Sequence, residues 1–129
     1  MNSYPIVHVD FPAQDTASAA KFYKEAFGWE ITHEESVDYW MFSAAGGPGG
    51  GFVKEGGSYS PGAQGTHEIG KPIVYLGSED IEADLARVEA AGGHTVVPRV
   101  EMGPYGAFAI FADSAGNNVG FFQAPAASA

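Results

Sequence analysis

The sequence predicts an α+β fold built from two tandem modules, each with the element order strand, helix, strand, strand, strand. Short runs rich in valine, isoleucine and aromatic residues alternate with glycine-rich turns, and an amphipathic run follows the first strand of each half. The glycines that end these two helical runs, Gly28 and Gly93, lie 65 residues apart (93 − 28). The same shift carries His8 onto Ile73 at the head of the second half, which indicates a duplicated unit.

Composition sets the boundaries of the modules. We expect a first module over residues 1–54, a second over residues 71–124 and a linker over residues 55–70, together forming one domain. The linker is rich in glycine, serine and proline and has no periodic apolar pattern.

The first module is expected to open with a strand at residues 6–11, which Pro12 should stop. Successive side chains of a strand point to opposite faces. Ile6, His8 and Asp10 therefore share one face of this strand.

A helix is predicted over residues 17–27, begun by the capping pair Asp15–Thr16 and ended by Gly28. Its apolar side chains recur at spacings of three and four, which is typical of an amphipathic helix. They are Ala19, Phe22, Tyr23, Ala26 and Phe27. Strands at 29–33, 38–43 and 52–54 should complete the module, with the glycine-rich run 46–51 as the turn before the last strand.

The second module repeats this order. A strand at 73–77 precedes a helix that Ser78 should cap, and Gly92–Gly93 should end that helix. The buried stripe of this helix is expected to be Ile81, Leu85, Val88 and Ala91. Strands are predicted at 94–97, 105–112 and 118–123, with Pro98 stopping the first of them and residues 113–117 forming the last turn.

Charge and cysteine content exclude several classes of function. Six basic and 16 acidic residues give a net charge of −10, which repels phosphate backbones and anionic membranes, so we expect neither nucleic acid nor a membrane as a partner. The sequence has no cysteine, which excludes disulfides, zinc–thiolate sites and thiol nucleophiles. We see no secretory signal and no apolar run of the ~18 residues that a membrane span needs, so the expected location is the cytoplasm.

Several motifs, taken in order, resemble the vicinal oxygen chelate (glyoxalase/bleomycin-resistance/dioxygenase) superfamily. His8 followed by residues 22–28 is similar to the family's strand histidine and its F-Y-x-x-x-x-G helix end. Residues 111–117 are similar to the family's F-x-D-P-D-G-N turn, with Ser114 and Ala115 in place of proline and aspartate. The resemblance implies curved mixed sheets around a cup, helices on the outside, and a homodimer as in many members.

The resemblance also defines where a metal would bind. Metal-dependent members hold a divalent cation with one side chain from the first strand and one from the last strand of each module. Carried over one at a time, these positions fall on His8, about Gly51, Ile73 and Gly120. Only His8 offers a ligand atom, so we expect no metal cofactor. A rearranged set of His8, Asp10 and Glu68 remains conceivable.

Without a metal, the cup is expected to be apolar and aromatic, which suits a small apolar or aromatic organic molecule as the partner. On the third strand, Tyr39 and Met41 are favoured over Trp40 and Phe42 as the inward pair. The expected ligand-binding residues are His8, Asp10, Tyr39, Met41, Ile73, Tyr75 and Phe122.

Two alternatives stay open. The aromatic residues could fill the cup as an ordinary core. The protein could also be an enzyme: either a metal-dependent lyase, isomerase or dioxygenase with rearranged ligands, or a metal-free catalyst that uses His8 and Asp10 as an acid/base pair. Any two residues at i and i+2 on a strand share a face, so this pair by itself does not choose between binding and catalysis.

Overall fold

The computed structural model describes residues 2–56 and 66–125; the part of the expected linker at 57–65 lies outside the described residues. The chain divides into two units: residues 7–73, which we call the N-terminal module, and residues 2–6 with those from 74 onward, which we call the C-terminal module. Ile6 and Ile73, at the two boundaries, are described with the strands that they begin, and each module is described by itself. Each module combines one α-helix with four strands. The predicted α+β class and tandem element order are confirmed.

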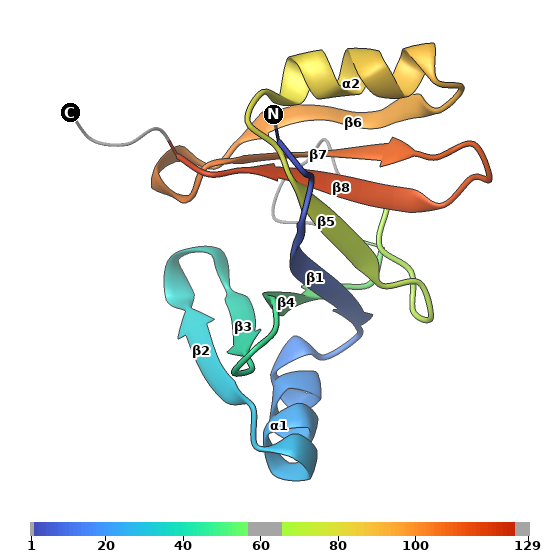
Figure 1. Ribbon diagram of the computed structural model, residues 1–129. Coiled ribbons are helices and arrows are strands. Elements are labelled where there is room, and N and C mark those ends of the chain that lie inside the picture. The colour runs from blue at the N-terminus through green and yellow to red at the C-terminus, as the bar shows by residue number, and fades with distance from the viewer. Residues whose placement is uncertain (1, 57–65, 126–129) are drawn as a thin grey trace. The chain divides into compact units, whose positions relative to one another are not determined.

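The N-terminal module has a mixed sheet with the strand order β2-β3-β4-β1. Its elements are β1 (Ile6–Ala13), α1 (Thr16–Phe27), β2 (Glu30–Glu34), a 3₁₀ turn (Glu35–Val37), β3 (Tyr39–Ser43) and β4 (Gly49–Lys54). The first strand runs parallel to the last, and the other neighbours are antiparallel. Helix α1 packs against β2, β3 and β4, as Figure 1 shows.

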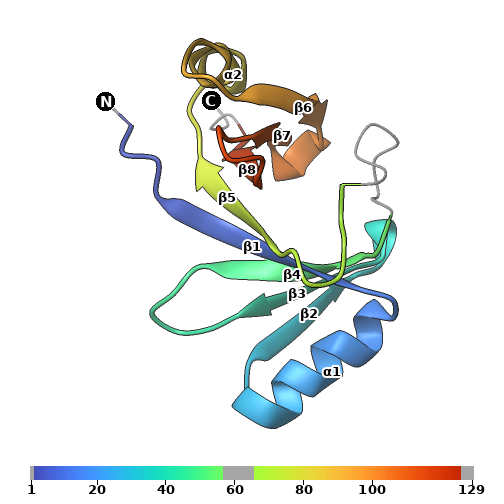
Figure 2. The same cartoon turned by 90° about the vertical axis from the view of Figure 1, so that its right-hand side faces the viewer.

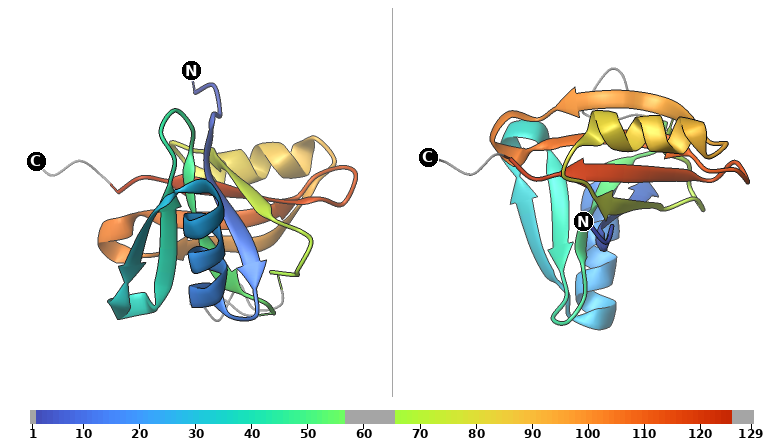
Figure 3. Two further views of the ribbon diagram at one scale, coloured as in Figure 1. Left: turned by 90° about the horizontal axis from the view of Figure 1, so that it is seen from below. Right: turned by 45° about the horizontal axis from the view of Figure 1, so that its top comes forward.

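The C-terminal module repeats this topology in the order β5-β8-β7-β6. Its elements are β5 (Ile73–Gly77), α2 (Ile81–Ala90), β6 (His94–Glu101), a 3₁₀ turn (Gly103–Tyr105), β7 (Ala107–Ala112) and β8 (Asn118–Gln123). Again the first strand is parallel to the last, and the others are antiparallel. Helix α2 packs against β6, β7 and β8, and runs beside β6 in Figure 2 and in the right panel of Figure 3.

The two modules match in register as well as in order. Asp10 of β1 pairs with Gly51 of β4, and Tyr75 of β5 pairs with Gly120 of β8. The shift of 65 read from the sequence carries Asp10 onto Tyr75 (10 + 65). Both residues therefore meet a glycine at the same place in the last strand of their module.

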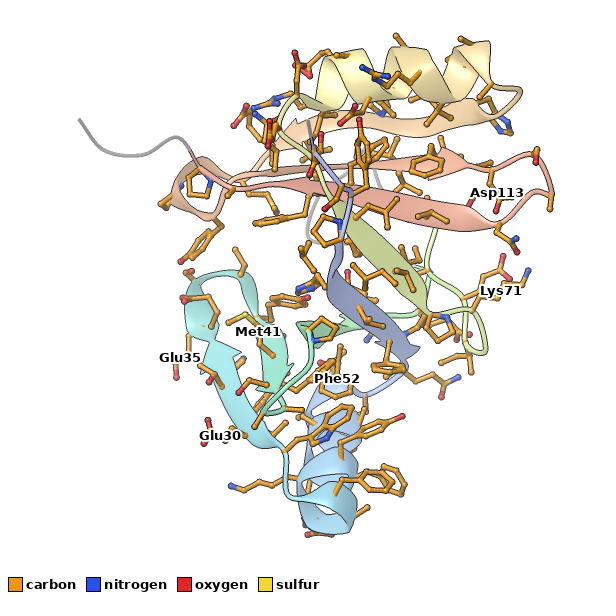
Figure 4. All side chains as sticks on the ribbon, in the orientation of Figure 1. Glu30, Glu35, Met41, Phe52, Lys71 and Asp113 are labelled. Carbon is orange, nitrogen blue, oxygen red and sulfur yellow. The ribbon has the colours of Figure 1, made fainter. Side chains whose placement is uncertain are left out.

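Helix α1 begins and ends where the sequence predicts. The Asp15 side chain accepts the Ser18 N–H at 3.0 Å, and Gly28 adopts a left-handed conformation (φ 73°) that a helix-ending glycine takes without strain. Ala20 packs in a core cluster with Phe42 and Phe52, the last of which is labelled in Figure 4. Half-buried side chains surround this cluster: Val9, Phe11, Ala19, Tyr23, Trp29, Ile31 and Trp40.

The apolar pattern of α1 is wider than its buried face. Phe22 and Phe27 are 58% and 64% exposed, although they share the predicted periodicity. They touch Tyr23 and each other as an aromatic group at the helix surface. Periodicity identified the helix correctly, and the tertiary structure then selected which of its apolar residues to bury.

In the C-terminal module the predicted cap is wrong by two residues. Asp80, not Ser78, caps α2, because its side chain accepts the Ala83 N–H at 3.2 Å. Ser78 instead donates to buried Asp84 at 2.6 Å, and Tyr4 donates to the other oxygen of Asp84 at 2.7 Å. The bond to Asp84 raises the pKa of the Tyr4 hydroxyl. These contacts fix the N-terminal residues to α2.

The core of the C-terminal module lies beneath α2. Its buried members are Ile81, Leu85, Ala107, Ala109, Phe111 and Phe121. Of the predicted stripe, Ile81 and Leu85 are buried and Val88 packs at the margin, whereas Ala91 is exposed at the helix end. The prediction for the last residue of the stripe is wrong because the helix has already ended there.

Two prolines do not stop their strands as predicted. β1 continues through Pro12 to Ala13, paired with β4 up to Lys54. β6 continues through Pro98 to Glu101 as the edge strand of its module, with register shifts between Thr95 and Val100. Proline lacks only the backbone N–H, so the irregular edge strand β6 accepts Pro98.

The glycine-rich run before β4 is not all turn. β4 begins at Gly49, so Gly49, Gly50 and Gly51 are strand residues and only the earlier part of the run is a turn. A Cβ at Gly50 would overlap the Val9 carbonyl oxygen and the Phe42 ring. In β7 the error is opposite: the strand starts at Ala107, because residues 103–105 form the 3₁₀ turn.

Replacing Gly50 by alanine should destabilise the protein by about 1–3 kcal/mol, because the added methyl group has to displace backbone as well as a core ring. The control is Gly47→Ala, where a Cβ meets nothing within 4 Å and the free energy of unfolding should change by no more than about 0.5 kcal/mol. Urea unfolding measures both. Equal stability of the two variants would contradict this account of β4.

The cap of α1 should respond to pH. The N–H of Ser18 bonds to the Asp15 carboxylate and lowers the pKa of Asp15 below its ordinary value. Its contribution is therefore present above the ordinary aspartate range and is lost as pH falls through the lowered pKa. The difference in melting temperature between wild type and Asp15→Ala should shrink on acidification. Asp15→Asn keeps a cap that does not titrate, so the Asn–Ala difference should be independent of pH.

Candidate functional site

The two pairs of side chains on β3 lie on opposite faces of the sheet. Trp40 and Phe42 pack in the core beneath α1. Alternation along the strand then places Tyr39 and Met41 on the opposite face of the sheet. Met41 is labelled on β3 in Figure 4.

Three predicted residues of the N-terminal module meet on this face, and we call them the polar cluster: His8, Asp10 and Tyr39. His8 Nε2 lies 2.9 Å from Asp10 Oδ1 and 2.6 Å from the Tyr39 hydroxyl oxygen. The Tyr39 hydroxyl also donates to Asp10 Oδ1. The Asp10 side chain is 3% exposed and that of His8 is 28% exposed, so the histidine is the accessible member.

Gly51 explains how Tyr39 reaches Asp10. Gly51 pairs with Asp10 on one side and with Met41 on the other, so β4 separates β3 from β1. A Cβ at Gly51 would overlap the Tyr39 phenol, which therefore fills the space that a side chain at this position would need. The absence of a side chain lets the phenol cross over β4 and complete the polar cluster.

In the C-terminal module a tyrosine ring also fills the space beside a strand glycine, but its partner is apolar. The Tyr75 ring lies where a Cβ of Gly120 would be, and it meets Phe108 edge-on with ring centroids 6.5 Å apart. Ile73 and Tyr75 are buried, and Phe122 is half-buried on the same face. These predicted residues thus share a face in their module, as alternation required.

Sequence reasoning missed two residues of this face, Phe108 and Ile110 of β7. Ile110 pairs with Gly120 as Met41 pairs with Gly51, and Phe108 precedes it as Tyr39 precedes Met41. Applying the alternation of the third strand to the second module would have found both.

The residues at the family's metal positions do not fit a divalent cation. Gly51 and Gly120 have no ligand atom, and the space of each missing side chain holds a tyrosine ring. Ile73 is apolar and buried. Within residues 2–56 and 66–125, no group of three or more His, Cys, Asp or Glu side chains is placed to hold a metal ion.

Glu68, the substitute ligand in the rearranged set, has another partner. It pairs with Lys71 at 3.0 Å. The set of His8, Asp10 and Glu68 is therefore not assembled among the described residues.

A match to a known family model identifies the family of this chain. The family model of the Glyoxalase/Bleomycin resistance protein/Dioxygenase superfamily matches residues 5–121. The chain belongs to this superfamily. Neither helix in the described part of the chain is long and apolar enough to cross a bilayer.

Two curated relatives match most of the chain. The anthracycline biosynthesis protein DnrV of Streptomyces peucetius is 30% identical over 116 residues, covering 83% of this chain and 42% of DnrV. The putative glyoxylase CFP32 of Mycobacterium tuberculosis is 28% identical over 126 residues, covering 90% of this chain and 44% of CFP32. The superfamily member described here thus spans less than half the length of these relatives.

Several solved structures share the fold of this chain. A hypothetical protein from Bacillus halodurans C-125 superposes with a TM-score of 0.70 at 13% identity, covering 98% of this chain and 99% of that one. Methylmalonyl-CoA epimerase from Mycobacterium tuberculosis gives 0.69 at 12% identity, covering 97% and 90%. At these identities the likeness concerns the fold alone.

Removing the Tyr39 hydroxyl should show that the polar cluster is part of the fold. Tyr39→Phe deprives buried Asp10 of a donor and should lower the free energy of unfolding by about 1–3 kcal/mol. Tyr105→Phe, at a side chain that is 48% exposed, is the control and should change it by no more than about 0.5 kcal/mol. Thermal unfolding of both variants measures the difference, and an unaffected Tyr39→Phe protein would contradict the contact.

Proposed function

We propose that this protein binds a small apolar or aromatic molecule without a metal cofactor. The observation that carries the proposal is the filling of two of the family's metal-ligand positions: tyrosine rings occupy the space above Gly51 and Gly120. A divalent ion needs several oxygen or nitrogen ligands. Of the four family ligand positions in this chain, only His8 carries a side chain that could bind a metal ion.

The faces that carry these rings suit an organic ligand. In the C-terminal module half-buried Phe122 lies on the face of Tyr75 and Phe108, two buried rings that meet edge-on. His8, Tyr39 and Met41 offer two polar groups and one adaptable apolar side chain in the N-terminal module. Apolar surface with a few placed polar groups is the usual make-up of a small-molecule site.

The names of the relatives support an aromatic ligand. DnrV is named for anthracycline biosynthesis, and anthracyclines are polycyclic aromatic compounds. We therefore favour a planar aromatic molecule as the bound species, held by this protein in the manner of a binding protein.

A second candidate is metal-free acid/base catalysis by His8. Its support is the buried Asp10 carboxylate 2.9 Å from the imidazole, since a carboxylate that orients a histidine makes a workable base. Turnover that His8→Ala abolishes, with ligand affinity retained, would favour this candidate over binding alone.

Metal analysis and ligand binding test the proposal together. Protein purified without chelator should contain no stoichiometric nickel, zinc, iron or manganese by mass spectrometry. Planar aromatic compounds should raise its melting temperature equally with and without EDTA, since stabilisation follows ligand concentration over Kd. His8→Ala should weaken this shift, whereas His94→Ala, at an exposed residue of β6, should not.

Stoichiometric metal, with EDTA abolishing the ligand-induced shift, would contradict the proposal. That result would support the alternative of a metal-dependent lyase, isomerase or dioxygenase with a rearranged ligand set.

A further inference from the structure

Helix α1 carries a group of apolar side chains that the N-terminal module does not bury. Phe22 and Phe27 are 58% and 64% exposed, and Ala26 is exposed on the same helix. The Phe22 ring meets those of Tyr23 and Phe27 edge-on, with centroids 5.2 and 6.3 Å away, so the rings are contiguous. Single exposed apolar residues are normal on a protein surface, whereas a contiguous group is typical of an interaction surface. We call the group Ala19, Phe22, Tyr23, Ala26 and Phe27 the aromatic face.

The spacing of these residues matches the way in which helices pack. Residues three and four apart lie on the same side of a helix, so Ala19, Phe22 and Ala26 follow one line along α1. Together with Tyr23 they stand at positions i, i+3, i+4 and i+7, which outline a hole on the helix surface. The alanines at its two ends are small, so the hole has room for a large side chain of a facing helix.

Phe22 is a side chain of the size that this hole accepts, so the aromatic face is complementary to itself. When two copies of α1 pack antiparallel, Phe22 of each copy enters the hole of the other. The hole is centred between residues 22 and 23, so both insertions occur together about one twofold axis at this point. A symmetric interface needs this reciprocity, because the same patch serves both partners.

The charges along the edge of the aromatic face fit the same arrangement. The Lys21 and Glu25 side chains are 75% and 68% exposed and lie one helical turn apart. Their midpoint is residue 23, next to the axis defined by Phe22. In the antiparallel pair, Lys21 of one copy therefore lies opposite Glu25 of the other, and two such ion pairs flank the rings. A partner with an unrelated charge pattern would lack this match, so charge complementarity favours a second copy.

We propose that α1 binds α1 of a second copy of this chain, antiparallel and through the aromatic face, to form a symmetric dimer. The inference goes beyond the proposed function, because α1 covers one face of the sheet and the polar cluster lies on the other. It assigns a surface to the homodimer that was expected from the sequence.

The dimer should be weak. Helix α1 has 12 residues and is about 18 Å long, so one helix pair buries less than the roughly 800 Å² per partner of a standard interface. The net charge of −10 also repels the two copies. We therefore expect a dissociation constant on the order of 10–100 µM at about 0.15 M salt, where screening shortens the range of that repulsion to about 8 Å.

Sedimentation of the whole chain at concentrations below and above this range tests the inference. Wild type should pass from monomer to dimer. Phe22→Lys should raise the dissociation constant at least about tenfold, the effect of losing a central side chain, even though its lower net charge of −9 (−10 + 1) reduces the repulsion. Tyr105→Lys makes the same charge change at a side chain that is 48% exposed in the C-terminal module, and it should dimerise as wild type.

Exchanging the two charges tests the antiparallel arrangement without altering a ring. Lys21→Glu places glutamates opposite each other in its homodimer, and Glu25→Lys places lysines opposite each other, so each variant alone should dimerise more weakly than wild type. A mixture restores both opposite-charge pairs and should form a heterodimer more tightly than either variant forms a homodimer. Both substitutions are at exposed positions, so they should leave folding unchanged even where Phe22→Lys does not.

Wild type that stays monomeric over the whole range would overturn the inference, and the aromatic face would then belong to a different partner. Dimerisation of Phe22→Lys with wild-type affinity, or a mixture of the charge variants that gains nothing, would also overturn it. The melting-temperature shift from planar aromatic compounds is a separate readout. Phe22→Lys should keep that shift, so failure of the dimer leaves the proposed function in place.

Discussion

A side chain at Gly51 or at Gly120 would occupy space that a tyrosine ring fills, and this exclusion organises both modules. Each glycine lies in the last strand, paired with the first strand on one side and with the third on the other. The missing side chain opens a path across the middle strand. In the N-terminal module Tyr39 uses the path to reach Asp10, and in the C-terminal module Tyr75 covers Gly120 and meets Phe108.

The overlap at these two glycines also bears on metal binding by this protein. Restoring a ligand at Gly51 would require Tyr39 to leave, and the polar cluster would lose a member. Restoring one at Gly120 would displace the ring of Tyr75, which is buried. A single substitution at either glycine therefore does not recreate a ligand, because the neighbouring ring has to move with it.

The two modules share one strand topology and differ in the side chains at matching positions. The shift of 65 residues carries His8 onto Ile73 and Asp10 onto Tyr75, so a polar pair in one repeat corresponds to an apolar and an aromatic residue in the other. The polar cluster of His8, Asp10 and Tyr39 thus belongs to the N-terminal module. A duplicated fold permits this, since only the core side of each sheet must keep its packing with the helix.

The sequence by itself determined the class, the order of elements, the duplication, and the face of each candidate site residue, because hydrophobic period and strand alternation are local properties of the chain. It placed His8, Asp10, Tyr39 and Met41 on one face correctly. The sequence-based predictions of strand ends were wrong where pairing with a neighbouring strand determines the structure. Pro12 and Pro98 lie within strands, and Gly49 to Gly51 belong to β4. Only the tertiary structure joined Tyr39 to Asp10, because that contact crosses β4 between residues 29 positions apart and depends on the empty space above Gly51.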